Sequence, residues 1–321
     1  MDHLQIESYL TKNYTRFSTE VLLRRPTFFV SNDDLLQKLD DRKQWVLIGK
    51  GSFGEVYKAK WLGVDVAVKT SDEYVSENPI LEEFIISSSI RHPNIVSFFV
   101  ASPNYIVMEL MDNGTLDDIL AKQRFSVPPM EIRKRWCSQI AMAVYYLHES
   151  GIVHSDIKPE NIMIDSNWRA KVCDVGGGYF IDDDPRDKIY TDMYLPLTLH
   201  LGEKGDLGKA TDMYSLVSVM LCILSWEKDL YKLLGIQNFE RMLSENSVTR
   251  EEVIGKSLKT CLLRVYNMIK SYDISHEAKS FMFMMFSEPC KHHVDDPDVQ
   301  RVIENNREAC RSLDFIVLSE M

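Results

Sequence analysis

Side chains suited to phosphate chemistry stand at widely separated points of the chain. The residues concerned are Lys69, Asp156, Lys158, Asn161 and Asp174. An ammonium group can neutralise phosphate oxygens, and a carboxylate can accept the proton of a hydroxyl group. Carboxylate and amide oxygens are ligands that magnesium prefers. Together these residue types could hold a magnesium-bound triphosphate and transfer its terminal phosphoryl group.

A glycine-rich segment, Gly49-x-Gly51-x-x-Gly54, precedes Lys69. The same spacing occurs in dinucleotide-binding proteins, where a helix must follow the glycines directly. Here residues 56–59 alternate like a strand, so we expect the glycines to join two strands. Because glycine has no Cβ atom, its backbone can lie close to phosphates. The segment fits a phosphate-covering hairpin, and an ordinary glycine-rich turn is the alternative.

Hydrophobic patterning predicts the elements that must position these residues. We expect strands at residues 46–48, 56–59 and 64–68, a buried strand at 106–108, and a helix at 80–90.

The second half of the chain has a helical pattern. Amphipathic residues 131–148 and apolar residues 215–225 predict two helices, and the chain from Trp226 onwards also reads as helical. A small sheet followed by a larger helical body predicts an α+β fold. Residues 1–42 match no motif, and we expect a helical extension packed on the domain, with a regulatory arm as the alternative.

Composition narrows the class of protein. The chain has 321 residues, of which 45% are hydrophobic, and this suffices for a sizeable core. Its net charge of −11 disfavours nucleic acid as a partner, because phosphates would repel it. The six cysteines form no CxxC pair, which indicates reduced thiols. Without a signal peptide, a membrane-spanning run or a myristoylation glycine, we expect a cytoplasmic protein, or a nuclear one, that does not bind membranes.

Three motifs together resemble the eukaryotic-type protein kinases. They are Val-Ala-Val-Lys at 66–69, His-Ser-Asp-Ile-Lys-Pro-Glu-Asn at 154–161, and Asp-Val-Gly at 174–176. The resemblance runs from about Trp45 into the C-terminal hundred residues. It implies a bilobal kinase domain over residues 43–321, after an N-terminal extension over residues 1–42. The β-rich N-lobe would span residues 43–110, and the larger helical C-lobe residues 111–321.

The resemblance assigns Lys69 to the α- and β-phosphates of ATP and pairs it with a helix glutamate. That glutamate usually lies nine residues before the histidine of a His-Pro-Asn sequence, here His92, which selects Glu83. Glu82 is the alternative, and only one of the two can face Lys69 because one helical residue turns a side chain by about 100°.

The same resemblance implies an adenine-binding hinge. The backbones of Glu109 and Met111 would bond the adenine edge, and Met108 would guard the rear pocket. The full set of residues expected around ATP is Ile48, Gly49, Lys50, Gly51, Ser52, Phe53, Gly54, Val56, Ala67, Lys69, Met108, Glu109, Met111 and Met163.

In kinases of this type the catalytic loop and the metal loop divide the chemistry. Asp156 would accept the proton of the substrate hydroxyl or orient that hydroxyl, and Lys158 would neutralise the transferred group. Asn161 and Asp174 would hold Mg²⁺. The Lys-Pro-Glu string resembles serine/threonine kinases, with dual specificity as an alternative, and residues 61–69 resemble the tyrosine-kinase-like group.

The chain departs from the family first in the catalytic loop. Ser155 replaces the arginine that normally grips an activation-loop phosphate. Phosphorylation of Tyr190, Thr191 or Tyr194 would then meet no arginine here, so we expect activity not to require it. For the acidic run at 182–184 there are two hypotheses: it imitates a phosphate, or it is a solvated loop.

A second departure concerns residues 195–197, where Leu-Pro-Leu replaces Ala-Pro-Glu. The arginine that pairs with that glutamate is also absent, because His292 takes its position. The loss of both partners avoids a lone buried charge. We expect Leu197 to hold the segment by packing.

Further departures affect packing around the metal loop. Val175 replaces phenylalanine and Ser87 replaces an apolar helix residue, so we expect a thinner packed column and a mobile activation segment. Tyr214 replaces a tryptophan, a mild change next to Asp212, which should brace the catalytic loop. Cys173 could react with electrophilic ligands, although an inert buried thiol is favoured.

Three functions compete. The leading one is an ATP- and magnesium-dependent serine/threonine kinase that acts on protein substrates. A pseudokinase, which binds nucleotide as a scaffold, is the second. The third is a small-molecule phosphotransferase of similar fold. The sequence indicates no oligomeric state.

Overall fold

The computed structural model describes residues 30–51, 54–70, 83, 86–102, 104–121, 126–181, 192–196, 199, 208–236, 249–287, 294–310 and 318. The chain divides into two compact units. The β unit comprises Met1–Asp112 together with Asp174–Gly176. The helical unit comprises Asn113–Cys173 together with Gly177–Met321.

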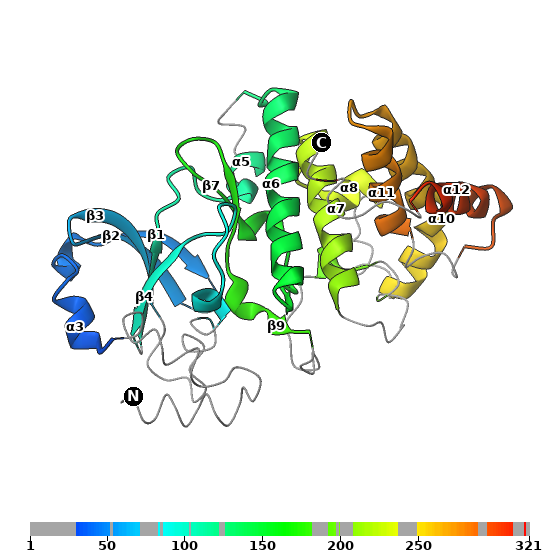
Figure 1. Ribbon diagram of the computed structural model, residues 1–321. Coiled ribbons are helices and arrows are strands. Elements are labelled where there is room, and N and C mark those ends of the chain that lie inside the picture. Colours follow the sequence, from blue (N-terminus) through cyan, green and yellow to red (C-terminus); the bar gives the residue numbers. More distant parts are fainter. Residues whose placement is uncertain are drawn as a thin grey trace. The chain divides into compact units, whose positions relative to one another are not determined.

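The β unit is built on an antiparallel sheet of five strands in the order β1-β2-β3-β5-β4 (Figure 1). The strands are β1 (Val46–Gly51), β2 (Gly54–Trp61), β3 (Val64–Thr70), β4 (Phe98–Ser102) and β5 (Tyr105–Glu109). The four expected strands are confirmed, whereas β4 was not predicted. Glu83 and residues 86–89 are helical, in agreement with the helix expected at 80–90.

One face of this sheet forms the core of the β unit. Val66, Val68 and Val107 are fully buried there, because alternate residues of a strand share a face. Residues from before the sheet complete this core, including Leu35, Leu39 and Trp45. Part of the segment that matched no motif is therefore integral to the unit.

Residues 31–44 form short helical elements against the sheet. Helix α3 (Asn32–Leu36) is capped by Ser31, whose side chain accepts a hydrogen bond from the Asp34 backbone. A 3-10 turn, η1 (Arg42–Gln44), leads into β1. Between them Leu39 bridges to Trp61, which ties this segment to the end of β2.

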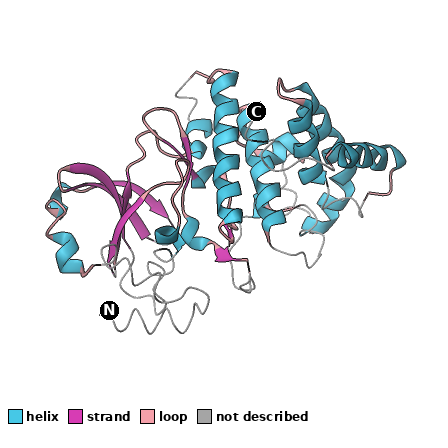
Figure 2. Cartoon of the chain, in the orientation of Figure 1, coloured by secondary structure: helices cyan, strands magenta, loops and turns pink. Residues whose placement is uncertain are grey.

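The helical unit contains long helices and short strands (Figure 2). Its helices include α5 (Leu116–Ala121), α6 (Met130–Glu149), α7 (Lys209–Ser225), α8 (Leu230–Leu234), α10 (Arg250–Ser271), α11 (His276–Ser287) and α12 (Pro297–Ala309). Its strands pair as two small ladders, β6 (Ile152–Val153) with β9 (Tyr179–Phe180) and β7 (Ile162–Ile164) with β8 (Ala170–Val172). Its 3-10 turns η2 (Pro159–Asn161) and η5 (Asp192–Tyr194) lie in loops, whereas η3 (Val175–Gly177) begins in the Asp174–Gly176 segment of the β unit.

Helices α6 and α7 pack against each other in the middle of the helical unit (Figure 1). The helix predicted at 131–148 is confirmed almost to the residue. The helix predicted at 215–225 is present, but it begins at Lys209. The prediction missed its first turns because they contain buried polar residues such as Asp212 and show no clear apolar pattern. The Tyr214 ring stacks on Phe286 with centroids 4.7 Å apart.

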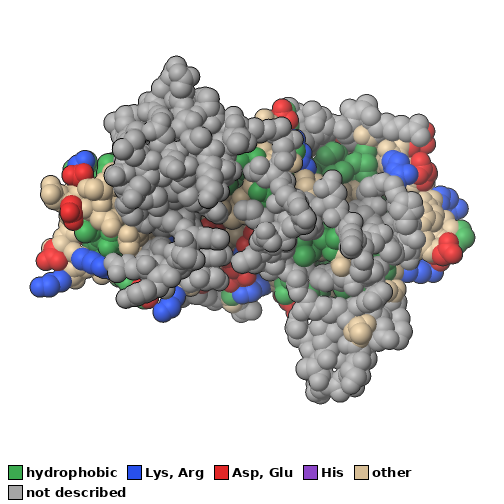
Figure 3. Space-filling model, turned by 90° about the horizontal axis from the view of Figure 1, so that it is seen from below, with side chains coloured by type: hydrophobic (Ala, Val, Ile, Leu, Met, Phe, Trp, Pro, Cys, Tyr) green, Lys and Arg blue, Asp and Glu red, His purple; other side chains and the backbone are tan. Residues whose placement is uncertain are grey.

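Together the two units confirm the predicted α+β class. Among the described residues, no helix combines the length and the apolar composition that crossing a bilayer requires. On the face shown in Figure 3, described Lys and Arg side chains lie interspersed with Asp and Glu.

Candidate functional site

Lys69 lies between two carboxylates of the β unit. Its Nζ atom is 2.7 Å from Oε2 of Glu83 and 3.0 Å from Oδ1 of Asp174. The side chains of Lys69 and Glu83 are only 14% and 13% exposed. The ion pair expected with Glu83 is therefore present. Glu82 lies outside the described residues.

The electrostatics of this cluster keep Lys69 charged. Burial alone would lower the pKa of Lys69, but the charges of Glu83 and Asp174 outweigh it and raise that pKa. Burial raises the pKa of Glu83, which the Lys69 ammonium opposes. Removing one member of the cluster would leave a partly buried charge without its partner, which is costly in free energy. The two ion pairs therefore stabilise the positions of all three side chains.

The sheet brings several expected ATP-binding residues to one face. Val56 pairs with Lys69 across β2 and β3, and Ala67 pairs with Met108 across β3 and β5. Directly opposed residues share a face, as do residues two apart on one strand. Val56, Ala67, Lys69 and Met108 therefore lie on the face opposite the buried valines.

The glycine-rich segment is a hairpin between β1 and β2, as predicted. Gly51 pairs with Gly54, and Gly54 has a φ of 134°, which side chains rarely adopt. A Cβ atom at Gly49 would meet nothing closer than Val56 Cβ at 3.8 Å, so the described protein atoms do not themselves require glycine there. Ser52 and Phe53 lie outside the described residues.

The other expected ATP-binding residues of β1 are exposed. Ile48 is 49% exposed, and Lys50 forms an ion pair with Glu55 across the hairpin at 3.3 Å. Exposed apolar surface next to the glycines is compatible with a ligand covering it.

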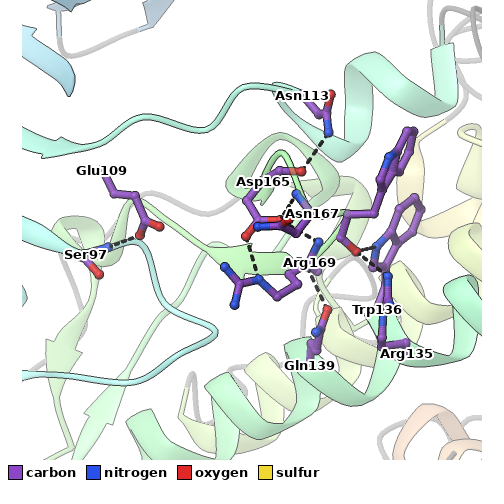
Figure 4. A network of polar contacts seen from close by, with 11 residues as sticks. Ser97, Glu109, Asn113, Arg135, Trp136, Gln139, Asp165, Asn167 and Arg169 are labelled. Carbon is purple, nitrogen blue, oxygen red and sulfur yellow. Dashed lines mark hydrogen bonds and ion pairs between the residues drawn. The ribbon is translucent and has the colours of Figure 1, made fainter. Parts of the chain in front are cut away.

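The expected hinge strand is fixed at Glu109. Its backbone N–H donates to Ser97 O at 2.9 Å, and its carboxylate accepts from Ser97 N at 3.1 Å (Figure 4). Met111 follows as a buried residue. In the helical unit, Met163 lies half-buried on β7 and bridges to Thr115.

Residues 154–161 of the helical unit, the expected catalytic loop, contain the side chains expected to act on the hydroxyl group. Lys158 Nζ is 2.6 Å from Asp156 Oδ2. Asn161 Nδ2 donates to the same oxygen at 3.0 Å and to the Asp156 carbonyl at 2.8 Å. The Asp156 carboxylate is thus oriented from two sides.

His154 connects this loop to the strand that leads to Asp174. Its Nδ1 accepts from Asp156 N at 3.3 Å, so the ring proton is on Nε2, which donates to Cys173 O at 2.9 Å. Cys173 N in turn donates to Asn161 O at 3.0 Å. Asp174 follows with a φ of 59°, a strained conformation of the kind found at functional sites.

Asp212 braces the catalytic loop, as the sequence predicted. Its two carboxylate oxygens accept from the backbone N–H groups of His154 and Ser155, both at 2.8 Å. His148 Nε2 lies 2.9 Å from the same carboxylate. The group is buried at the start of α7, so the helix anchors the loop.

Ser155, which replaces the usual arginine, has a structural partner of its own. It has a φ of 68°, and its Oγ donates to Gly177 O at 3.2 Å. Ile181 N adds a bond to Gly151 O at 2.9 Å, next to the β6–β9 ladder. Residues 177 and 181, at the start of the expected activation segment, are thus hydrogen-bonded to Ser155 and Gly151.

The turn between β7 and β8 is held by a buried carboxylate (Figure 4). Asp165 accepts from the backbones of Asn167 and Arg169 at 2.8 and 2.9 Å, and from Arg169 Nε at 2.7 Å. Asn113 Nδ2 donates to the Asp165 carbonyl at 2.7 Å. Although burial opposes ionisation, hydrogen bonds from Arg169 and Asn167 lower the pKa of Asp165.

The donor atoms fit magnesium that arrives with a nucleotide. Magnesium is usually held by one or two protein oxygens together with substrate phosphates. Among the described residues, no three His, Cys, Asp or Glu side chains form a metal-binding group. In the helical unit, Asn161 donates through Nδ2, so its Oδ1 is the atom able to coordinate. In the β unit, the other expected ligand, Asp174, carries a carboxylate.

The structure describes some of the positions at which the sequence departs from the kinase pattern or at which a phosphorylation site was considered. Tyr194 is only 5% exposed, so its side chain is largely shielded from solvent. Val175 is buried in η3. The following positions lie outside the described residues: Asp182, Asp183, Asp184, Tyr190, Thr191, Leu197 and His292.

Three contacts around the expected site residues were not predicted from the sequence. They are the Ser155–Gly177 bond, the His148–Asp212 bond, and a close approach of Gly176 to Glu83. Only the His148 contact could have been predicted from the sequence, because His148 is a histidine among the otherwise apolar buried residues of α6.

Comparisons with known proteins identify the family of the chain. A model of the protein kinase domain matches residues 43–294. A serine/threonine-protein kinase/receptor of Acanthamoeba polyphaga mimivirus is 43% identical over 40% of this chain and 8% of its own length. The probable serine/threonine-protein kinase kinX of Dictyostelium discoideum is 32% identical over 56% of this chain and 17% of its own length.

A serine/threonine-protein kinase-like protein of Arabidopsis thaliana is 35% identical over 61% of this chain and 64% of its own length. The chain spans only a small part of the mimivirus and Dictyostelium proteins, and under two thirds of the plant protein. The family model covers well over half of the chain. The chain therefore belongs to the protein kinase family.

Proposed function

We propose that the chain is a serine/threonine protein kinase that transfers the γ-phosphate of ATP, with Mg²⁺, to hydroxyl groups of protein substrates. One observation carries this proposal: the Lys69 ammonium pairs with both Glu83 and Asp174, at 2.7 and 3.0 Å. An ammonium group between these two carboxylates suits the contact with phosphates that the family makes.

The β unit would hold the nucleotide. Lys69 would contact the α- and β-phosphates, and the hairpin of Gly49, Gly51 and Gly54 would cover them. The adenine would lie on the sheet face that carries Val56, Ala67 and Met108. Because the Glu109 N–H is bonded to Ser97, its carbonyl would accept from the adenine amine, and Met111 N would donate.

The helical unit would orient the substrate. Asp156 would accept the proton of the attacking hydroxyl or align it, since Asn161 and Lys158 fix its carboxylate. Lys158 would neutralise the transferred group. Asn161 and Asp174 would hold magnesium, which bridges phosphates and offsets charge that develops during transfer.

Serine and threonine are the proposed acceptors. The Lys-Pro-Glu string at 158–160 supports this choice, and so do the names of the related proteins. Membership of the tyrosine-kinase-like group is a further proposal, supported by the residue pattern at 61–69.

We also propose that activity does not require a phosphorylated activation loop. The Ser155 Oγ bond to Gly177 supports this, because it links the two segments that an arginine and a phosphate would otherwise join. The buried side chain of Tyr194 supports it as well.

Labelled ATP with a generic basic protein tests the proposal, with wild type compared with Asp156→Asn. We expect phosphoserine and phosphothreonine from wild type only, and phosphotyrosine in addition would indicate dual specificity. Nucleotide binding without transfer would favour a pseudokinase. The sequence features that support this alternative are Ser155 and the Leu-Pro-Leu sequence at 195–197. Transfer to a metabolite alone would favour a small-molecule phosphotransferase.

A further inference from the structure

Gly176 lies so close to Glu83 that no side chain fits between them. A Cβ atom built on Gly176 would be 2.3 Å from Glu83 Cγ, 2.4 Å from its Cβ and 2.7 Å from its Cα. Rotation of the Glu83 side chain cannot relieve the last contact, because Cα belongs to the backbone. Any larger residue at 176 must therefore displace either the helix that carries Glu83 or the segment around Gly176.

The contact closes a ring of interactions in the β unit. Glu83 pairs with Lys69, Lys69 pairs with Asp174, and Asp174 is two residues from Gly176. The segment has little room to withdraw from Glu83. Val175 is 5% exposed, and Asp174 already has the strained φ of 59°.

We propose that Gly176 is a positioning residue: its missing side chain lets the Asp174 segment pack directly on residue 83 and so fixes Glu83 at Lys69. Direct backbone contact then couples helix position to the metal loop, although Val175 and Ser87 leave the expected apolar column thin. The inference rests on the proposed function only for its catalytic consequence, because the packing exists without nucleotide.

The neighbouring glycine offers a matched control. A Cβ atom at Gly177 would meet no atom within 4 Å, and neither glycine has a positive φ, so alanine suits the backbone at both positions. Gly176→Ala and Gly177→Ala therefore make the same chemical change one residue apart, with and without the steric conflict.

Hydrogen exchange of the nucleotide-free protein is the first test. We expect Gly176→Ala to speed exchange of amides in residues 83–90 by about tenfold or more, because the helix loses the Lys69–Glu83 anchor. Gly177→Ala should exchange like wild type. Equal exchange in the two variants would overturn the proposal. This readout stands even if the protein transfers no phosphate.

A second test removes the obstacle. Glu83→Gly deletes the two nearest of the three conflicting atoms, so Gly176→Ala should lower Tm less in the Glu83→Gly background than in wild type. If the single variant Gly176→Ala does not fold, folding of the double variant Glu83→Gly/Gly176→Ala supports the proposal. An equal loss of Tm, or of folding, in both backgrounds would refute it.

Discussion

Replacement of Asp212 by asparagine tests whether one buried carboxylate holds the loop that carries Asp156. The Asp212 side chain is 1% exposed and lies within hydrogen-bond distance of His148 Nε2, His154 N and Ser155 N, at 2.9, 2.8 and 2.8 Å. Asparagine has the same shape but offers one accepting oxygen and one donating amide. At least one of the three donors must then face another donor.

The expected cost follows from those three bonds. A hydrogen bond to a charged group contributes about 1.5–3 kcal/mol, and a buried unsatisfied donor costs about 1–3 kcal/mol. With the remaining bonds weakened by loss of the charge, Asp212→Asn should lower the free energy of unfolding by about 3–5 kcal/mol. At about 2–4 °C per kcal/mol, Tm should fall by about 6–20 °C.

Thermal and urea unfolding measure this effect, and Asp273→Asn is the matched control. The Asp273 side chain is 96% exposed and pairs with Lys134 at 3.2 Å. The same substitution there should leave Tm within about 1 °C of wild type, because exposed ion pairs contribute little. If Asp212→Asn unfolded at the temperature of Asp273→Asn, the carboxylate would not be the anchor of the catalytic loop.

Other contacts lead to further predictions. Ser155→Ala removes the bond to Gly177 O, so we expect a loss of about 0.5–1.5 kcal/mol in unfolding free energy, together with slower phosphate transfer. Phosphatase treatment of wild type should leave transfer unchanged, and a loss of activity on such treatment would disprove independence from loop phosphorylation. Asp165→Asn should cost about 1–3 kcal/mol at neutral pH. Since the folded-state pKa of Asp165 is lowered, its stabilisation is present above the unfolded pKa of about 3.9 and is lost as pH falls through the folded pKa. The stability gap between wild type and Asp165→Asn should therefore narrow as pH falls below about 4, and a constant gap would contradict this assignment.

Much of the β unit could be predicted, because its predicted strands are short runs rich in β-branched and other apolar residues, and its glycines and Lys69 mark strand ends. Strand β4 was not predicted. Nearly all residues of Phe98–Ser102 are buried, so the strand shows no alternation of apolar and polar residues. The two-residue strands β6 and β9 are too short to show a period. Leu35 and Leu39 enter the core from outside the motif region, and their spacing of four residues was the available signal.

The chemical residues were easier to predict than their supports. Lys69, Asp156 and Asn161 stand in compact motifs, so residue type and spacing identify them. The contact of Gly176 with Glu83, by contrast, joins residues far apart in the chain and depends on the absence of a side chain. The Ser155–Gly177 bond uses a backbone acceptor, which no residue type reveals.

Lys69→Met and Asp156→Asn, measured side by side for ATP affinity and for phosphate transfer, test the central claim most directly. We predict that Lys69→Met weakens ATP binding and reduces transfer by about 100-fold or more, because it removes the ammonium from the phosphates. Asp156→Asn should bind ATP within about twofold of wild type yet lose transfer to a similar extent, since its role begins at the hydroxyl. Transfer by Asp156→Asn at the wild-type rate would contradict the account.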